Sequence, residues 1–236
     1  YLNNGNEFST HVVWEEPFES TCVAPYPACV GRLARYFHAG SGDHQWLFLM
    51  DINGDTLPDR VAAVTNNSLP LNQREFWIAF NTGNGWATDS NGEPLVEVWV
   101  DPFKGNYPGT SDEAKWFMDM NGDGLVDRVI NASEQTDYPG DDGYLVHYNT
   151  GSGFNMTATF WSDPLSVLNS SHGGIGRLSY NGDYGLLAFL RDMNGDGLPD
   201  RVFAANLHDD LDDPDAEPVG TGWGYYLNRN GNGWSE

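Results

Sequence analysis

One motif of nine residues occurs three times in this chain of 236 residues. The copies read DINGDTLPD at 51–59, DMNGDGLVD at 119–127 and DMNGDGLPD at 192–200. An apolar run precedes each copy, and Arg-Val follows each one. A tandem repeat with a spacing of about 70 residues predicts a row of similar structural units, and it constrains the architecture more than any local propensity does.

The motif places oxygen-bearing side chains at its positions 1, 3, 5 and 9. This spacing lets a tight loop surround Ca²⁺, with a backbone carbonyl expected at position 7. Mg²⁺ is the chemical alternative, but it usually keeps several waters, and an acidic turn without metal is the structural one. Three calcium sites are therefore predicted, with these ligands: Asp51, Asn53, Asp55, Leu57 and Asp59; Asp119, Asn121, Asp123, Leu125 and Asp127; Asp192, Asn194, Asp196, Leu198 and Asp200.

The flanks of the loops indicate strands and exclude helix-flanked EF-hands. An EF-hand loop needs a bidentate Glu at position 12, which here holds Ala62, Ile130 and Phe203. We expect the position-7 leucines to turn their side chains toward the core. The Arg at position 10 is expected to clamp the loop carboxylates or a neighbouring unit, and an exposed Arg is the alternative.

Two further signatures recur in phase with the acidic loop. An Asn/Gly-rich turn reads FNTGNGW at 80–86 and YNTGSGF at 148–154, with looser copies at 2–8 and 227–234. Such a cluster between apolar residues predicts a hairpin turn. The other signature is WEEPF at 14–18, WVDPF at 99–103 and WSDPL at 161–165, and we expect its Trp residues (Trp14, Trp99 and Trp161) to pack in the core or between units.

These signatures divide the chain into repeat units at 1–79, 80–147 and 148–226. Residues 227–236 resemble residues 1–10 and are expected to begin a further unit or to link subunits. With 28 Gly, 13 Pro and short aromatic or β-branched runs, the chain is predicted to be all-β. The expected fold is three tandem antiparallel, blade-like β-sheet units that carry the calcium loops.

The loop between hydrophobic strands, followed by an N-T-G-x-G-aromatic turn, resembles the FG-GAP/VCBS repeat family. In that family such repeats are typically blades of a β-propeller with Ca²⁺ in a loop between strands. The resemblance implies the ligand side chains named above. Because a closed ring generally needs at least four blades, three units imply a partial propeller or an open stacked array.

The formal charge of −23 excludes nucleic acid as a partner, because the chain has no basic patch to neutralise phosphates. No run of 18 or more apolar residues is present, so no membrane span is expected. Neither a signal peptide nor an initiating Met is visible, and we interpret the sequence as a mature or trimmed segment.

Two cysteines and four sequons bear on the compartment. Cys22 and Cys29, with prolines between them, are expected to form a small disulfide in an oxidising environment; two reduced thiols are the alternative. Glycosylation sequons begin at Asn66, Asn131, Asn155 and Asn169. Together with the calcium loops, these features indicate a secreted or cell-surface protein.

No catalytic constellation is recognisable, and the chain is not expected to be an enzyme. The predicted function is a calcium-stabilised structural or assembly module, a building block of a filament or larger surface protein whose copies or repeats pack head-to-tail. The alternative is a carbohydrate-binding, lectin-like adhesion module. Its candidate stacking faces for glycans are Trp77, Trp86, Trp223 and Trp234.

Overall fold

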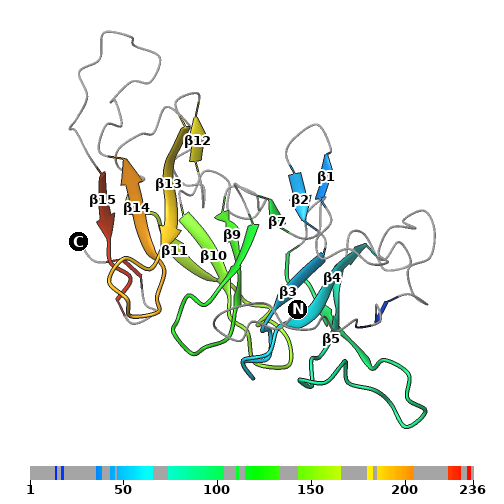
Figure 1. Ribbon diagram of the computed structural model, residues 1–236. Coiled ribbons are helices and arrows are strands. Elements are labelled where there is room, and N and C mark those ends of the chain that lie inside the picture. The colour runs from blue at the N-terminus through cyan, green and yellow to red at the C-terminus, as the bar shows by residue number, and fades with distance from the viewer. Residues whose placement is uncertain are drawn as a thin grey trace, which may run out of the picture.

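The chain forms an all-β fold with three antiparallel sheets, which confirms the predicted fold class (Figure 1). The computed structural model describes residues 14, 17–18, 36–38, 43–45, 47–65, 74–103, 110–111, 115–132, 143–165, 180–182, 185–204, 223–229 and 233–234. Over these residues the elements are strands, turns and bends, without an α-helix. No helix capable of crossing a membrane is found in this described part.

The first sheet is a four-stranded meander. Its strands are β3 (Leu47–Met50), β4 (Asp59–Thr65), β5 (Arg74–Ala79) and β6 (Val96–Val100), in that order. The acidic loop 51–59 joins β3 to β4, and the Asn/Gly-rich turn at 80–86 follows β5. Along β5, Phe76 and Ile78 are buried and Trp77 between them is half-buried, because successive side chains point to opposite faces of the sheet.

The second sheet repeats this meander and extends it at one edge. Its core strands are β8 (Lys115–Met118), β9 (Asp127–Asn131), β10 (Gly143–His147) and β11 (Thr159–Ser162). Three short strands continue from β8: β7 (Thr110–Ser111), β2 (Asp43–Gln45) and β1 (Tyr36–His38). Strands β1 and β2, which precede the first sheet in sequence, therefore belong to the second sheet.

The third sheet has the strand order β12-β13-β14-β15. Its strands are β12 (Tyr180–Gly182), β13 (Gly185–Arg191), β14 (Asp200–Ala204) and β15 (Trp223–Tyr226). The acidic loop joins β13 to β14, and the turn follows β15. In loop and turn positions, β13, β14 and β15 thus correspond to β3, β4 and β5 of the first sheet.

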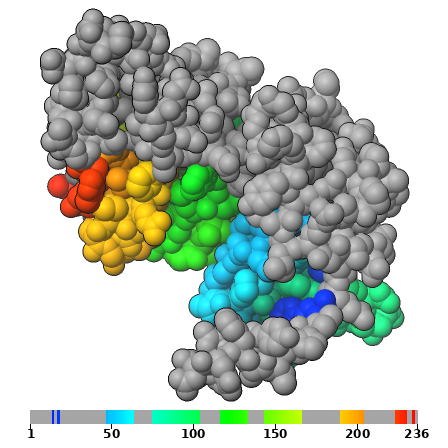
Figure 2. Space-filling model, turned by 45° about the horizontal axis from the view of Figure 1, so that its top comes forward, coloured from blue at the N-terminus to red at the C-terminus, as the bar shows by residue number. Residues whose placement is uncertain are grey.

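The three sheets follow one another in a row, with β15 at the end that carries the C-terminus (Figure 1). The same progression from cyan through green to orange and red is visible on the molecular surface (Figure 2). The first two sheets each combine strands from both sides of a repeat boundary, since β5 ends at Ala79 and β6 begins at Val96, and β10 ends at His147 and β11 begins at Thr159. The structural unit, meaning a sheet with its acidic loop and the Asn/Gly-rich turn that follows its strands, is therefore offset from the sequence repeat, and the word unit is used below in this structural sense.

Apolar clusters fill the junctions between consecutive sheets. At the first junction, Phe76 and Trp99 of the first sheet pack with Phe154 and Phe117 of the second unit. At the second junction, Tyr144 and Trp161 of the second sheet pack with Leu190 and Trp234 of the third unit. Burial of the expected core residues Trp99 and Trp161, each 3% exposed, confirms their packing role.

Candidate metal loops and the junctions between them

The first aspartate of each acidic loop organises the loop backbone. In the first loop, Asp51 Oδ1 accepts the Gly54 N–H at 2.8 Å and Asp51 Oδ2 accepts the Thr56 N–H at 2.7 Å. The same two contacts recur in the other loops, from Asp119 and Asp192. One carboxylate therefore gathers the amides of positions 4 and 6 and folds the loop tightly.

Positions 3 and 5 form a second layer of contacts inside the loop. Asn53 Oδ1 accepts the Asp55 N–H at 3.0 Å, and Asn53 Nδ2 donates to Asp55 Oδ2 at 3.0 Å. Asp55 Oδ1 in turn accepts the Leu57 N–H at 2.8 Å. The second and third loops repeat all three bonds, so the three loops share one conformation.

Position 9 joins the acidic loop to the hairpin turn of its own sheet. Asp59 is fully buried; its Oδ2 accepts the Ile52 N–H at 3.1 Å and its Oδ1 accepts the Asn81 N–H at 2.9 Å. Asp127 and Asp200 make the equivalent pairs of bonds. These contacts give the repeated Asp at position 9 a structural role that sequence reasoning, which considered only metal ligation, missed.

The buried position-9 carboxyl groups of the first two loops have raised pKa values. Burial raises the pKa of Asp127 to about 7, and repulsion from Asp123 and Asp119 acts in the same direction. The pKa of Asp59 is also raised by burial, with smaller contributions from Asp55 and Asp51. At the exposed rim of the third loop, backbone hydrogen bonds to the carboxylate lower the pKa of Asp192 instead.

The donor chemistry of the loops suits a hard divalent cation, since each loop offers carboxylate and amide oxygens and no nitrogen or sulfur ligand. Each carboxylate oxygen can accept more than one contact, so the amide bonds within the loop leave acceptor capacity. Within the described ranges, however, no three His, Cys, Asp or Glu side chains converge as a ready-made metal cluster. The predicted ligands lie in the same loops, with their carboxylates directed at loop amides.

Thr56 occupies a strained backbone position in the first loop. Its φ is 72°, whereas the matching residues of the other loops are Gly124 and Gly197, each at 86°. A β-branched residue adopts this left-handed conformation only at a cost of about 1 kcal/mol or more, which glycine avoids. The first loop therefore carries a conformational penalty that the other two do not.

Each junction between units contains a hydrogen bond from a turn to the preceding acidic loop. Asn149 Nδ2 donates to the Ile52 carbonyl at 2.8 Å, and Asn228 Nδ2 donates to the Met120 carbonyl at 3.0 Å. Asn149 and Asn228 are both buried. The acidic loop of one unit is thus fastened to the hairpin turn of the next.

The position-7 leucine also packs across the junction. A Cβ built on Gly54 would lie 2.8 Å from Leu125 Cδ2, and one built on Gly122 would lie 2.9 Å from Leu198 Cδ2. The leucine of each following loop therefore covers the position-4 glycine of the loop before it. Of the leucines expected to face the core, Leu198 is buried and Leu125 is half-buried, and both contact the neighbouring loop.

In the second and third sheets, the repeated Arg forms a buried ion pair with the acid of the Trp-x-Asp-Pro segment. Arg128 Nη2 lies 3.3 Å from Asp101 Oδ2, and Arg201 Nη2 lies 2.9 Å from Asp163 Oδ2, with all four side chains fully buried. The first pair joins the segment after β6 to β9, and the second joins the segment after β11 to β14. Of the roles expected for this Arg, the structure shows the clamp on a neighbouring unit.

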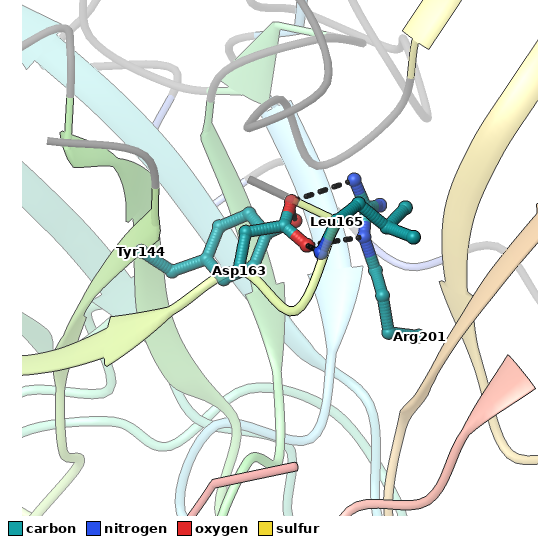
Figure 3. A network of polar contacts seen from close by, with 4 residues as sticks. All are labelled: Tyr144, Asp163, Leu165 and Arg201. Carbon is teal, nitrogen blue, oxygen red and sulfur yellow. Dashed lines mark hydrogen bonds and ion pairs between the residues drawn. The ribbon is translucent and has the colours of Figure 1, made fainter. Parts of the chain in front are cut away.

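Figure 3 shows the second ion pair and its surroundings. Tyr144 donates its hydroxyl proton to Asp163 Oδ2 at 2.7 Å, and the Leu165 N–H bonds Asp163 Oδ1 at 3.0 Å. The Arg201 guanidinium carbon also lies 5.6 Å from the centre of the Tyr144 ring. Asp163 therefore ties the tyrosine of β10 to the arginine of β14.

Some predicted residues fall outside these loops. Asn131 is 2% exposed within β9, and glycosylation at this sequon stays a prediction. Asn155 is exposed and stays a candidate. Cys22, Cys29, Asn66 and Asn169 lie outside the described residues.

Comparison with protein-family models, with curated proteins and with solved structures finds no match to this chain.

Proposed function

We propose that this protein is a calcium-stabilised, non-catalytic structural module of an extracellular assembly. The observation that carries the proposal is the contact that the first and second acidic loops each make with the unit that follows. Leu125 covers Gly54, and Asn149 bonds the carbonyl of Ile52. Any interaction that fixes the conformation of the loop therefore also stabilises the junction between the two units.

Calcium is the cation that fits the donor set. Burial raises the pKa of Asp59, and repulsion from Asp55 and Asp51 acts in the same direction. A bound divalent cation would offset that repulsion and stabilise the folded state by mass action. Calcium accepts six to eight oxygen ligands in flexible geometry, which suits side chains of mixed exposure better than the octahedral demand of Mg²⁺ does.

The loops would hold the cation through the position-1, -3 and -5 side chains and the position-7 carbonyl. Position 9 supports the loop mainly through backbone hydrogen bonds. Asp59 accepts the Ile52 and Asn81 N–H groups and adds negative charge to the loop. The same division of roles applies to the second and third loops. A metal bound there would order the loop that joins two strands, together with the hairpin turn that packs on that loop.

An extracellular location agrees with this chemistry. Calcium is plentiful outside cells, where modules of low affinity are filled. The cysteine pair and the exposed sequon at Asn155 are the sequence features that point the same way.

A carbohydrate-binding module is the second candidate, and one observation favours it. Trp223 and Tyr225 are 63% and 45% exposed on β15, with ring centres 6.1 Å apart and planes inclined by 29°. Exposed, nearly parallel aromatic faces can stack on the apolar face of a sugar ring. A glycan array on the intact chain would test this candidate.

The primary test compares metal-free and calcium-loaded protein. Calcium should raise the thermal midpoint and increase the assembled mass measured by light scattering, and magnesium at equal concentration should do so far less. A chain that remains a monomer of unchanged stability in millimolar calcium would contradict the proposed function.

A further inference from the structure

The outer face of the third sheet exposes residues whose counterparts are buried in the other sheets. Trp223 lies opposite Ala204, as Phe76 lies opposite Ala63 and Tyr144 lies opposite Asn131. Phe76 and Tyr144 are fully buried, whereas Trp223 is 63% exposed. In the first two sheets the following unit covers this face. Within the described part of the chain, nothing equivalent covers it on the third.

The edge strand of the third sheet also differs from its counterparts. In the first sheet β5 pairs with β6, which sets Trp99 opposite Phe76; in the second, β10 pairs with β11, which sets Trp161 opposite Tyr144. The described strands of the third sheet end at β15, which pairs with β14 alone. The place of a Trp-bearing strand beside Trp223 is not filled by a described strand.

At the opposite end of the row, Trp14 has the surroundings of such a strand. Its ring lies 4.9 Å from that of Trp86, in the turn of the first unit, at an angle of 87°. The two junction tryptophans make the same edge contact with the turn that follows them: Trp99 with Phe154 at 5.6 Å and 83°, and Trp161 with Trp234 at 5.5 Å and 80°. Trp14 thus stands on the first unit as the tryptophan of a preceding sheet would.

The residue four positions after each tryptophan extends this correspondence. Phe18 is fully buried against Leu47, Ala62 and Ala79 of the first sheet. Leu165, four residues after Trp161, is fully buried with Phe203 and Tyr226 of the third sheet. Trp14 and Phe18 therefore contact the first unit as Trp161 and Leu165 contact the third.

Two smaller features are complementary across the ends. Leu49 on β3 is 45% exposed, although its counterparts on β8 and β13, Phe117 and Leu190, pack against the preceding sheet. Gly195 has no atom within 4 Å of a built Cβ, although Gly54 and Gly122 are each covered by the leucine of the following loop. At one end of the row Leu49 thus has no preceding sheet among the described residues to pack against, and at the other end Gly195 has no leucine of a following loop to cover it.

We propose that a second copy of this chain docks on β15 and adds the segment that carries its own Trp14 as the next antiparallel strand of the third sheet. This inference rests on the assembly role proposed above and specifies its interface. By the register of the two internal junctions, Trp14 of the second copy lies opposite Trp223, and Val12 lies opposite Tyr225. Leu49 of that copy then covers the aromatic pair.

The contact joins two different surfaces, so every docked copy presents a fresh β15. Such a heterologous contact propagates into a filament, or into a ring if the rotation closes. Main-chain pairing along a free edge supplies affinity, and the aromatic pocket supplies register. The charge of −23 on each copy opposes association, so added salt or calcium should favour it.

Cysteine cross-linking in the full-length chain tests the register. The double variant Val12→Cys, Tyr225→Cys should give a ladder of disulfide-linked multimers on mild oxidation in calcium. The matched control pairs Tyr225→Cys with Asn91→Cys, an exposed turn residue of the first unit, and should give no ladder. Multimers of the native chain without a ladder from the first pair would overturn this interface and leave the proposed assembly role intact.

A surface variant provides an independent readout. Trp223→Ser should raise the concentration needed for assembly at least tenfold with little change in the thermal midpoint, because this side chain is exposed in the single chain. Met156→Ser, at a residue 56% exposed on the second unit, should leave assembly unchanged. Unaltered assembly of Trp223→Ser, even with loss of glycan binding, would overturn the docking proposal. A native chain that stays monomeric in calcium would contradict both the interface and the proposed function.

Discussion

The side chain of Asn149 donates a hydrogen bond to the backbone carbonyl of Ile52, 97 residues earlier in the chain, at 2.8 Å. Asn149 belongs to the hairpin turn of the second unit, and Ile52 is the second residue of the first acidic loop. The same contact recurs one unit later, where Asn228 bonds the carbonyl of Met120. The sequence repeat is therefore matched by a repeated contact between neighbouring units.

Replacing Asn149 with Ala should destabilise the protein more than replacing Asn81 does. Both side chains bond a carbonyl of their own unit, Val126 and Pro58 respectively, but only Asn149 also reaches the preceding loop. A buried hydrogen bond contributes about 1 kcal/mol, and an unsatisfied carbonyl adds to the loss. Urea denaturation of the two variants measures the difference; equal losses would show that the bond between units contributes nothing.

Thr56→Gly should stabilise the protein by about 1 kcal/mol, since it relieves the positive φ of 72° in the first loop. The reverse change, Gly124→Thr at φ 86°, should destabilise it by a similar amount. Thermal denaturation in calcium would detect both shifts. A neutral or destabilising effect of Thr56→Gly would mean that Thr56 makes a compensating contact.

Asp163→Ala should destabilise the protein by about 3–5 kcal/mol, because it leaves the buried Arg201 without its counter-charge. The double variant Asp163→Leu, Arg201→Met removes both charges and should recover most of the loss. Tyr144→Phe deletes only the hydroxyl that bonds Asp163, and should cost about 1 kcal/mol. A single Asp163→Ala variant with a loss below about 1 kcal/mol would contradict the structural role of the pair.

Acidification should have opposite effects on the metal-free and calcium-loaded protein. The pKa of Asp127 is raised to about 7 in the fold, and that of Asp59 is raised as well. A raised carboxyl pKa favours the folded state when the group is protonated, so this stabilisation is present at low pH and is lost as the pH rises toward 7. Metal-free protein should therefore gain stability at these sites between about pH 7 and pH 5.

Calcium reverses the sign, because protons compete with the metal for the same carboxylates. Thermal midpoints measured across this pH range, in calcium and after metal removal, give the two slopes. Parallel slopes would contradict metal binding at the acidic loops.

The all-β class was predictable because three short motifs repeat in phase, and each carries a local signal. Asn and Gly mark the turns, and Trp99 and Trp161 mark buried strand positions. The offset between sheet and repeat was not predictable, since it depends on β6 pairing with β5 across the boundary at 79–80. Likewise, no local pattern shows that β2 pairs with β7 of the second sheet.

The acidic loops were located from sequence, but the second role of their last residue was not. Asp59 accepts amides that lie 7 and 22 residues away, and spacing alone does not reveal such a contact. The partner of the repeated Arg was equally open, because the loop carboxylates are nearer in sequence than Asp101, which lies 27 residues from Arg128. Packing between residues distant in sequence determines both the amide contacts of Asp59 and the ion pair of Arg128.

Calorimetric titration of metal-free protein with calcium tests the central claim most directly. The native chain should bind about three Ca²⁺ per molecule, and changing the first aspartate of one loop, as in Asp119→Asn, should remove one site. Asp89→Asn, outside the three loops, is the matched control and should leave the stoichiometry unchanged. No heat of binding with the native chain, or an undiminished stoichiometry in Asp119→Asn, would contradict the account.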